Sequence, residues 1–121
     1  MNMSDITTTL ATLKEMVSRF AAEREWEPFH SPKNLSMGLA VETAELMEHF
    51  LWVDSEASRQ VVKDRVELAA VADEVADVAC HLLNLTNALG IDLSQAITTK
   101  IAKNALKYPV EKCRGRYRVD K

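Results

Sequence analysis

The sequence predicts an all-α protein built as a four-helix bundle, and three observations favour that fold class. Its 121 residues include only 3 glycines and 3 prolines, while alanine, leucine, glutamate and lysine, which favour helices, are abundant. Apolar residues recur at spacings of three and four, the period of one helix face, and the alternation typical of strands is weak. Because no linker or repeat is visible, we expect residues 1–121 to form one domain with a single core.

The first helix is expected to start at Ser4 or Asp5 as its N-cap and to continue to about Glu25. The stretch 26–32 (WEPFHSP) cannot continue that helix because it contains two prolines. This loop is unusual, since it holds two of the five phenylalanine and tryptophan residues of the chain. The apolar stripe of the first helix consists of Ile6, Leu10, Leu13, Val17 and Phe20.

A second helix is expected over about residues 34–52, and the polar stretch 53–59 after it is interpreted as a connection. A third helix is expected over about residues 61–89, with Gly90 as its C-terminal cap. Because the third helix has apolar or small residues on more than one side, we expect it to be central or to lie in a subunit interface. These residues include Ala69, Ala70, Ala72, Val75, Ala76 and Ala79.

A fourth helix is expected over residues 93–107, with Asp92 as its N-cap and Pro109 just after its end. The remaining tail, from about residue 110 to 121, is basic. We expect part of this tail to be disordered.

Composition and charge exclude several classes of protein. A net charge of −3 gives no electrostatic reason to expect binding to nucleic acid, whose backbone needs a basic surface. No apolar run approaches the length that crosses a bilayer, and the first ten residues lack the basic start and apolar core of a signal peptide. Cys80 and Cys113 have no paired spacing, so we interpret both as free, non-catalytic thiols. We therefore expect a cytoplasmic protein with no membrane or nucleic-acid partner.

Four carboxylates lie where a helical chain would bury apolar side chains. Glu42 and Glu45 are three residues apart on the expected second helix, and Glu74 and Asp77 are three apart on the third. Each pair shares one helix face, with its members about 4.5 Å apart along the axis. Glu42 and Glu74 also fall on apolar seams, so we expect these acids to face inward. The seams are Leu35, Leu39, Leu46 and His49 on the second helix and Val71, Val78, Leu82 and Leu85 on the third.

An inward cluster of four ionised carboxylates needs compensating charge, because burial and like-charge repulsion both disfavour it. Mg²⁺ would supply that charge, and it takes oxygen ligands from carboxylates, water and substrate phosphates. The alternative is that the acids form a solvated helix face, as charged residues on helices usually do. Two such pairs on successive long helices favour the metal site.

The motifs that are present and absent limit the types of catalytic site that the chain could contain. Di-iron bundles use Glu-x-x-His pairs, whereas both acidic pairs here have a second carboxylate in that position. His49 and His81 follow acids at a spacing of four, and each is either a contact to a ligand or substrate or a hydrogen-bonded wall residue. No GxxxxGK[ST] phosphate loop, HExxH motif or nucleophile elbow is present. After these exclusions, the type of reaction that fits the residues is metal-dependent chemistry on a phosphorylated ligand.

The expected fourth helix carries a polar stripe. Lys100, Asn104 and Lys107 follow at spacings of four and three, so they share one face, and Tyr108 ends the helix beside them. Two cations and an amide on one stripe suit a triphosphate. The alternative is that lysines late in a helix favour the helix dipole and solvate an exposed face.

Together these residues resemble a known family. The two acidic pairs, separated by residues 46–73, and the ending K-x-x-x-N-x-x-K-Y-P over 100–109 resemble the MazG-like, all-α nucleoside triphosphate pyrophosphohydrolases. The stretch 19–35 (RFAAEREWEPFHSPKNL) is similar to the dCTP pyrophosphatase branch, in which such a segment precedes the first metal-binding helix. The match covers most of the chain.

The resemblance implies a dimer or dimer of dimers that hydrolyses a dCTP-like dNTP to dNMP and pyrophosphate, as part of nucleotide-pool house-cleaning. It implies Mg²⁺, with Mn²⁺ as a substitute, held by the positions that match Glu42, Glu45, Glu74 and Asp77. One departure is His81, which stands where a tyrosine is expected in the dCTP-type branch and leaves the preferred nucleotide open.

Hydrolysis between the α and β phosphates needs an activated water and charge neutralisation on the departing pyrophosphate, which Mg²⁺ can supply. Glu45 is our candidate for the base. The aromatic loop either stacks on the nucleobase or packs as part of the core. The candidate substrate-binding residues are Trp26, Phe29, His30, Asn34, Trp52, His81, Lys100, Asn104, Lys107 and Tyr108.

Two other functions stay open. The chain would instead be a non-catalytic helical module if its acids bind a structural cation or a basic partner, and such a module releases no pyrophosphate from any nucleotide. A phosphoribosyl-ATP pyrophosphohydrolase-like role is a third option, although the aromatic loop resembles the dNTP branch more.

Overall fold

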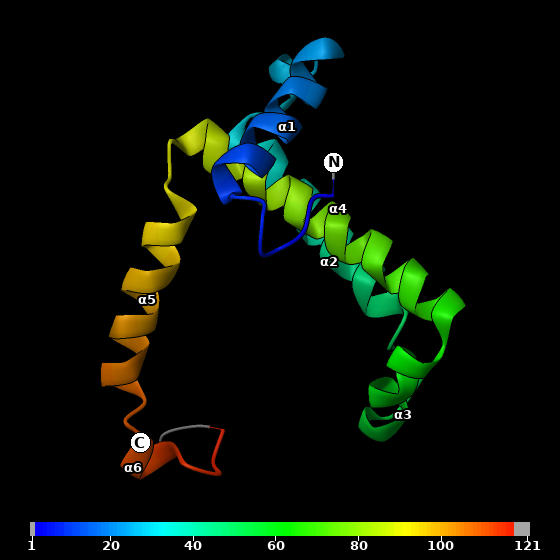
Figure 1. Cartoon of the computed structure of the whole chain (residues 1–121), viewed down its shortest axis with the longest axis vertical. Helices are drawn as coiled ribbons and strands as arrows, with labels where there is room; N and C mark the ends of the chain where they lie inside the picture. Colours follow the sequence, from blue (N-terminus) through cyan, green and yellow to red (C-terminus); the bar gives the residue numbers. More distant parts are fainter. Residues whose placement is uncertain (1, 118–121) are drawn as a thin grey trace. The chain divides into compact units, whose positions relative to one another are not determined.

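The computed structural model describes residues 2–117, and within that range all regular structure is helical (Figure 1). The all-α prediction is confirmed. Contacts divide the chain into two compact units, residues 1–90 and 91–121. Each unit is described by itself, and the expectation of a single domain stays a prediction.

Helix α1 spans Leu10–Glu23 and begins later than the sequence suggested. Thr9 is its N-cap, because the Thr9 side chain accepts a hydrogen bond from the backbone N–H of Thr12. The expected N-cap at Ser4 or Asp5 is wrong, since Ser4 instead exchanges hydrogen bonds with Thr7 in a separate turn. Ile6 therefore lies outside the helix and is 96% exposed.

The loop after α1 is more ordered than expected. It contains a 3-10 helix, Glu27–Phe29, and then enters α2, Pro32–Glu48. The start of α2 falls two residues before the expected one, because Ser31 caps the helix by accepting from the N–H of Asn34, and proline is well tolerated in the first turn. The expected end at residue 52 is wrong, because the chain turns at 49–52.

The stretch interpreted as a connection also contains a helix. Helix α3, Ser55–Arg59, forms because the Asp54 side chain accepts from the N–H of Ala57, and a 3-10 helix, Gln60–Lys63, follows it. The third expected helix appears as α4, Arg65–Leu89, whose start is delayed to the Asp64 cap. Its predicted end is confirmed, with Gly90 at φ 63°.

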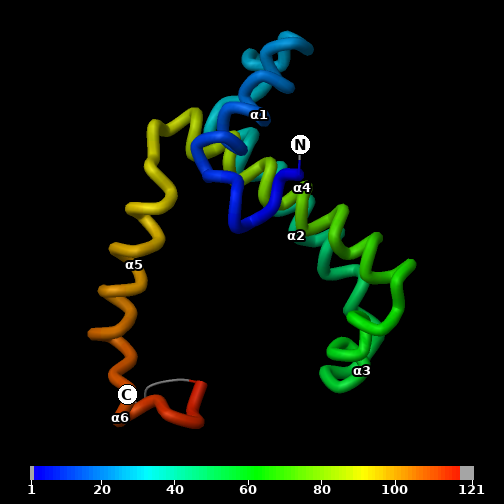
Figure 2. Tube along the Cα trace, in the orientation of Figure 1, coloured from blue at the N-terminus to red at the C-terminus, as the bar shows by residue number. Residues whose placement is uncertain are grey.

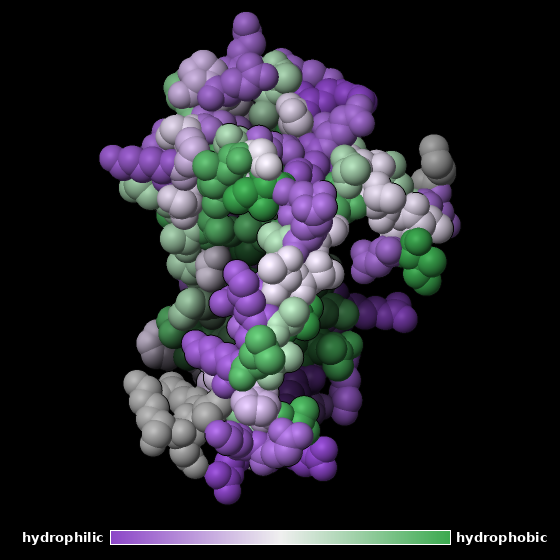
Figure 3. Space-filling view, turned by 90° about the vertical axis from the view of Figure 1, so that its left-hand side faces the viewer, coloured by the Kyte–Doolittle hydropathy of each residue, from purple (hydrophilic) through white to green (hydrophobic). Residues whose placement is uncertain are grey.

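The first unit is organised around α2 and α4, which run side by side, while α1 packs against α4 (Figures 1 and 2). Few side chains are buried in this arrangement. Many large apolar side chains stay open to solvent, as the green areas of Figure 3 show on one face. The buried apolar residues among those described are Ala21, Leu35, Val71 and Leu83.

The second unit contains α5, Leu93–Lys107, whose predicted bounds and Asp92 cap are confirmed. The beginning of the tail is helical, because α6 spans Val110–Cys113. Its last four residues, 118–121, lie outside the described part, so the expectation that part of the tail is disordered stays a prediction. Over the described residues, no helix is long and apolar enough to cross a membrane.

Candidate functional site

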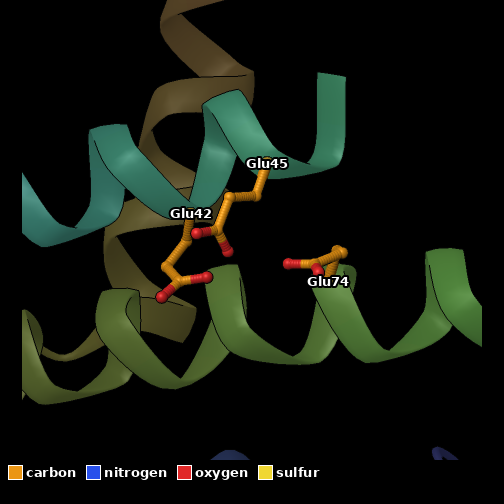
Figure 4. Close-up of side chains that lie close together, drawn as sticks. All are labelled: Glu42, Glu45 and Glu74. Atoms are coloured by element: carbon orange, nitrogen blue, oxygen red, sulfur yellow. The ribbon is translucent and has the colours of Figure 1, made fainter. Parts of the chain in front are cut away.

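Three carboxylates converge between α2 and α4. Glu42 and Glu45 project from α2 and Glu74 projects from α4, so that their side chains point toward one another (Figure 4). One carboxylate oxygen of each residue lies within 4.8 Å of the others. The spacing of three on α2 places its two acids on the face that meets α4. The convergence expected for four acids is therefore present for three of them.

Two oxygen atoms of this cluster have no hydrogen-bond partner. Glu42 Oε2 and Glu74 Oε2 are both buried from solvent, and neither accepts a hydrogen bond from any described group. A buried acceptor without a donor is costly, and more so if the group is charged. A hard divalent cation would satisfy these oxygen atoms and neutralise the repulsion between the three groups. The donor set therefore fits a divalent metal, as the sequence indicated.

The electrostatics of the cluster agree with that interpretation. Burial raises the pKa of the Glu42 carboxyl above its usual 4.5, and the neighbouring Glu45 and Asp77 carboxylates raise it further, while His81 opposes this. Burial also raises the pKa of Glu74, with help from the charges of Glu45 and Asp77, against the influence of His49. Both groups therefore hold protons more readily in the folded, metal-free protein.

These raised pKa values predict an unusual pH dependence. Stability from a carboxyl with a raised folded-state pKa is present below the unfolded value near 4.5 and is lost as the pH rises through the folded value. The Tm of the metal-free protein should therefore rise as the pH falls toward 4.5, and it should rise less in the Glu42→Gln/Glu74→Gln double variant. Thermal melts in EDTA measure this. A double variant with the wild-type pH profile would contradict the prediction.

Asp77 and Glu45 differ from the expectation of inward-facing acids, because both residues are exposed. The Glu45 carboxylate still joins the cluster, whereas that of Asp77 is not among the three that meet within 4.8 Å. Asp77 nevertheless acts on the cluster by its charge, and its side chain lines a neighbouring cavity. Asp77 therefore belongs to the cavity wall and influences the carboxylates through its charge.

This cavity has a volume of about 410 Å³ and lies within the first unit. An aromatic row forms part of its wall. The Phe20 and Trp26 rings meet edge to face at 5.8 Å, the Trp26 and His30 rings at 6.3 Å, and the Arg24 guanidinium lies 3.5 Å from the Phe20 ring centre. Its lining residues are Met16, Val17, Phe20, Trp26, His30, Asp77, Cys80, His81 and Asn84.

The cavity contains some predicted contacts and not others. Trp26, His30 and His81 line it, while Phe29, Asn34 and Trp52 do not. Asn34 instead donates from its amide to the carbonyl oxygen of Phe29, and Trp52 is 89% exposed. Substrate contact by these last three residues stays a prediction.

Sequence reasoning missed Phe20 and Asn84 as lining residues. Phe20 was assigned to the core stripe of α1, yet it is half exposed at the cavity wall. Asn84 follows His81 at a spacing of three, which places both residues on one face of α4, and this spacing could have indicated Asn84 as a lining residue.

Cys80 also lines the cavity. Burial and the charge of Asp77 raise the pKa of its thiol, in agreement with an unreactive free cysteine.

The two histidines behave as hydrogen-bonded residues beside the acids. His49 Nδ1 lies 2.8 Å from Glu67 Oε1 and so ties the end of α2 to the first turn of α4. His81 Nδ1 lies 3.0 Å from the carbonyl oxygen of Asp77, one turn earlier on α4.

The predicted phosphate-binding residues lie in the second unit. Lys100, Asn104 and Lys107 are on α5 at the predicted spacing, with the Lys107 ammonium 5.3 Å from the centre of the Tyr108 ring. Tyr108 caps the helix, because its N–H donates to the carbonyl oxygen of Asn104. Their proposed role in binding phosphate stays a prediction.

Comparison with known proteins agrees with the resemblance stated from the motifs. A model of the MazG-like family matches residues 38–117, which include all four acids. The dCTP pyrophosphatase 1 of Bos taurus is 40% identical over 108 residues, covering 88% of this chain and 63% of that protein. Its Homo sapiens counterpart is 38% identical over the same length. The chain thus spans 63% of the length of these curated relatives.

A solved structure is similar over nearly its whole length. The crystal structure of a pyrophosphatase from Archaeoglobus fulgidus matches with a TM-score of 0.78 and 32% sequence identity. The match covers 89% of this chain and 99% of the archaeal one. The all-α architecture is therefore shared with a protein that is named a pyrophosphatase.

Proposed function

Because this chain belongs to the MazG-like family, we propose that it hydrolyses a nucleoside triphosphate, of the dCTP type, to the monophosphate and pyrophosphate with Mg²⁺. The observation that carries the proposal is the cluster of Glu42, Glu45 and Glu74, with its two buried oxygen atoms that lack a partner. The similarity to dCTP pyrophosphatase 1 supports the choice of substrate. Asp77 is proposed as the fourth acid of the site.

In this reaction water attacks the α-phosphorus, the bond from that atom to the bridging oxygen breaks, and pyrophosphate leaves with the bridging oxygen. Mg²⁺, when bound, neutralises charge on the phosphates and polarises the water. Glu45 is proposed to take the proton of the attacking water, because its carboxylate joins the cluster from the more exposed side. Glu42 and Glu74 would hold the metal with their carboxylates.

The cavity beside the cluster is proposed to hold the base. Its aromatic row of Phe20, Trp26 and His30 offers stacking surfaces, while Asp77 and Asn84 offer polar groups for the edge of a base. Lys100, Asn104 and Lys107 are proposed to bind the phosphates. A cytoplasmic location and a homodimer or homotetramer complete the proposal, and the two free cysteines agree with a reducing compartment.

The test is a panel of all dNTPs, all NTPs and phosphoribosyl-ATP with Mg²⁺ or Mn²⁺, read out as pyrophosphate and monophosphate. We expect release from dNTPs, with cytosine nucleotides preferred. Release from phosphoribosyl-ATP alone would favour the biosynthetic alternative. No release from any nucleotide would contradict the enzyme and favour a non-catalytic metal-binding or interaction module.

Replacement of the aromatic residues should affect substrate more than fold. Trp26→Ala and His30→Ala are each expected to lower kcat/KM about 3- to 10-fold, mostly through KM, because an aromatic contact contributes about 0.5–1.5 kcal/mol. Both side chains line the cavity, and neither is fully buried. Ile6→Ala, at a residue that is 96% exposed, is the control. A large fall in Tm with unchanged kinetics would show that the loop is part of the core.

A further inference from the structure

The backbone has an unusual conformation just after the end of α1. Glu25 has a φ of 54°, and among the described residues it is the one non-glycine residue with a positive φ. This left-handed region disfavours residues that have a Cβ atom, and glycine is the usual residue at such a position after a helix. Glu25 therefore carries an energetic cost in the folded protein that glycine would avoid.

Hydrogen bonds and an aromatic contact hold Glu25 in this conformation. The Trp26 N–H donates to the carbonyl oxygen of Ala21 at 3.0 Å. The Glu25 N–H donates to the carbonyl oxygen of Ala22, also at 3.0 Å. These are the two bonds of a Schellman motif, which requires a left-handed residue and often adds an apolar contact back to the last turn of the helix. Here that contact is the edge-to-face pair of Trp26 and Phe20, at 5.8 Å.

The turn at Glu25 joins the two parts of the aromatic row in the cavity wall. Phe20 belongs to α1, whereas Trp26 and His30 belong to the loop, and all three line the cavity. The Phe20 ring is held on the helix by Arg24, whose guanidinium lies 3.5 Å from the ring centre and donates to the Phe20 carbonyl oxygen. The position of Trp26 against Phe20 therefore depends on the turn. Because the Glu25 side chain is exposed, it is the backbone of Glu25 that matters.

We propose that Glu25 is a positioning residue for the base of the substrate. Its left-handed backbone turns Trp26 back onto Phe20 and into the cavity wall, and so determines how tightly the base is bound. Any other backbone conformation at Glu25 breaks the bond from Trp26 to Ala21 and moves the indole ring away from the wall. This inference rests on the proposed function, because it uses the base position named there.

Substitutions that differ in their tolerance of a positive φ test this proposal. Glu25→Gly and Glu25→Asn suit the left-handed conformation, Glu25→Gln keeps the cost of glutamate without its charge, and Glu25→Val is disfavoured most because its Cβ is branched. The KM for dCTP should stay the same or fall in the first two, stay the same in Glu25→Gln, and rise about 3- to 10-fold in Glu25→Val, as for loss of an aromatic contact. A higher KM in Glu25→Gly, or a wild-type KM in folded Glu25→Val, overturns the proposal.

A double variant separates positioning from a general effect on the fold. Trp26→Ala removes the ring that the turn places. In a Trp26→Ala background, Glu25→Val should therefore change KM no further, whereas independent effects would multiply. A rise in KM that persists in this background would show that the turn acts on something other than Trp26, and it would overturn the proposal.

The fluorescence of Trp26 reports its position without any reaction. In a Trp52→Phe background Trp26 is the remaining tryptophan, and acrylamide should quench it least in Glu25→Gly, more in the wild type and Glu25→Gln, and most in Glu25→Val. If Glu25→Val does not fold, the comparison of Glu25→Gly with Glu25→Gln decides, because only glycine removes the cost of the positive φ. Equal quenching in these two variants then overturns the proposal.

Binding of α,β-methylene-dCTP distinguishes this inference from the proposed function. If the wild type binds this analogue but releases no pyrophosphate from dCTP, hydrolysis is refuted. A Kd that still follows the tolerance of a positive φ at position 25 would then uphold the role of Glu25. Equal Kd values in all the folded variants, or no binding of the analogue to the wild type, would overturn it.

Discussion

Glu42→Gln and Glu74→Gln should each abolish pyrophosphate release while the metal-free protein keeps its fold. These changes preserve shape and remove one charge from a cluster whose three carboxylates lie within 4.8 Å. If the acids hold Mg²⁺, the loss should exceed the roughly 10- to 100-fold that changes around metal ligands usually cost. Glu48→Gln, at an exposed acid on the same helix, is the matched control and should retain activity.

Although the same variants should lose activity, they should make the metal-free protein more stable. Burial and neighbouring charges raise the pKa of both Glu42 and Glu74, so each ionised carboxylate is disfavoured in the metal-free fold. Removing one charge should therefore raise Tm in EDTA. Added Mg²⁺ should stabilise the wild type by mass action, by about 2.7 kcal/mol at 100 times Kd, and should stabilise the variants much less.

Thermal melts with and without Mg²⁺, run beside the pyrophosphate assay, measure all of these effects. Variants that stay active would show that the carboxylates are structural. If adding Mg²⁺ does not change the Tm of the wild type, even with a non-hydrolysable nucleotide present, the proposed metal site is contradicted. Loss of activity in Glu48→Gln would show that charge on α2, and not this cluster, is what matters.

The helices whose ends are set by local chemistry were predicted best. Helix α5 agrees at both ends, because Asp92 caps its start and Pro109 follows its end. The start of α1 was wrong, since several neighbouring serine, threonine and aspartate residues compete for the cap and the sequence does not rank them. Helix α3 was missed because its five residues are too few to show a period.

The sequence predicted those features of the candidate site that depend on spacing within a single helix, but not those that depend on packing between helices. A spacing of three places Glu42 beside Glu45 whatever the tertiary structure. Which of Glu74 and Asp77 joins them depends on how α4 is rotated against α2, and that is set by packing rather than by spacing. The same limit explains why the close contact between Gly38 and His81 across the two helices was not predicted.

The protein is expected to have no stable monomer. In the described part of the chain only Ala21, Leu35, Val71 and Leu83 are buried apolar residues, whereas large apolar side chains such as Val41 and others of α2 and α4 are half exposed. So much apolar surface is unusual for a monomer and marks a surface that associates. A second copy of the chain is the expected partner, in agreement with the small residues on the outer side of α4. Those that are exposed include Ala69, Ala72, Ala76 and Ala79.

Light scattering should therefore show a dimer or tetramer at micromolar concentration, and Tm should rise with protein concentration, because association stabilises the folded chain by mass action. Ala72→Arg should dissociate the oligomer and lower Tm, since a long charged side chain would enter the interface. The control is Ala11→Arg, which introduces the same side chain at an exposed position off the apolar stripe of α1. It should leave the oligomeric state and Tm unchanged. A monodisperse, folded wild-type monomer would contradict the expectation. An Ala72→Arg variant that stays oligomeric would place the interface on another face of the helices, because arginine on a free surface has no such cost.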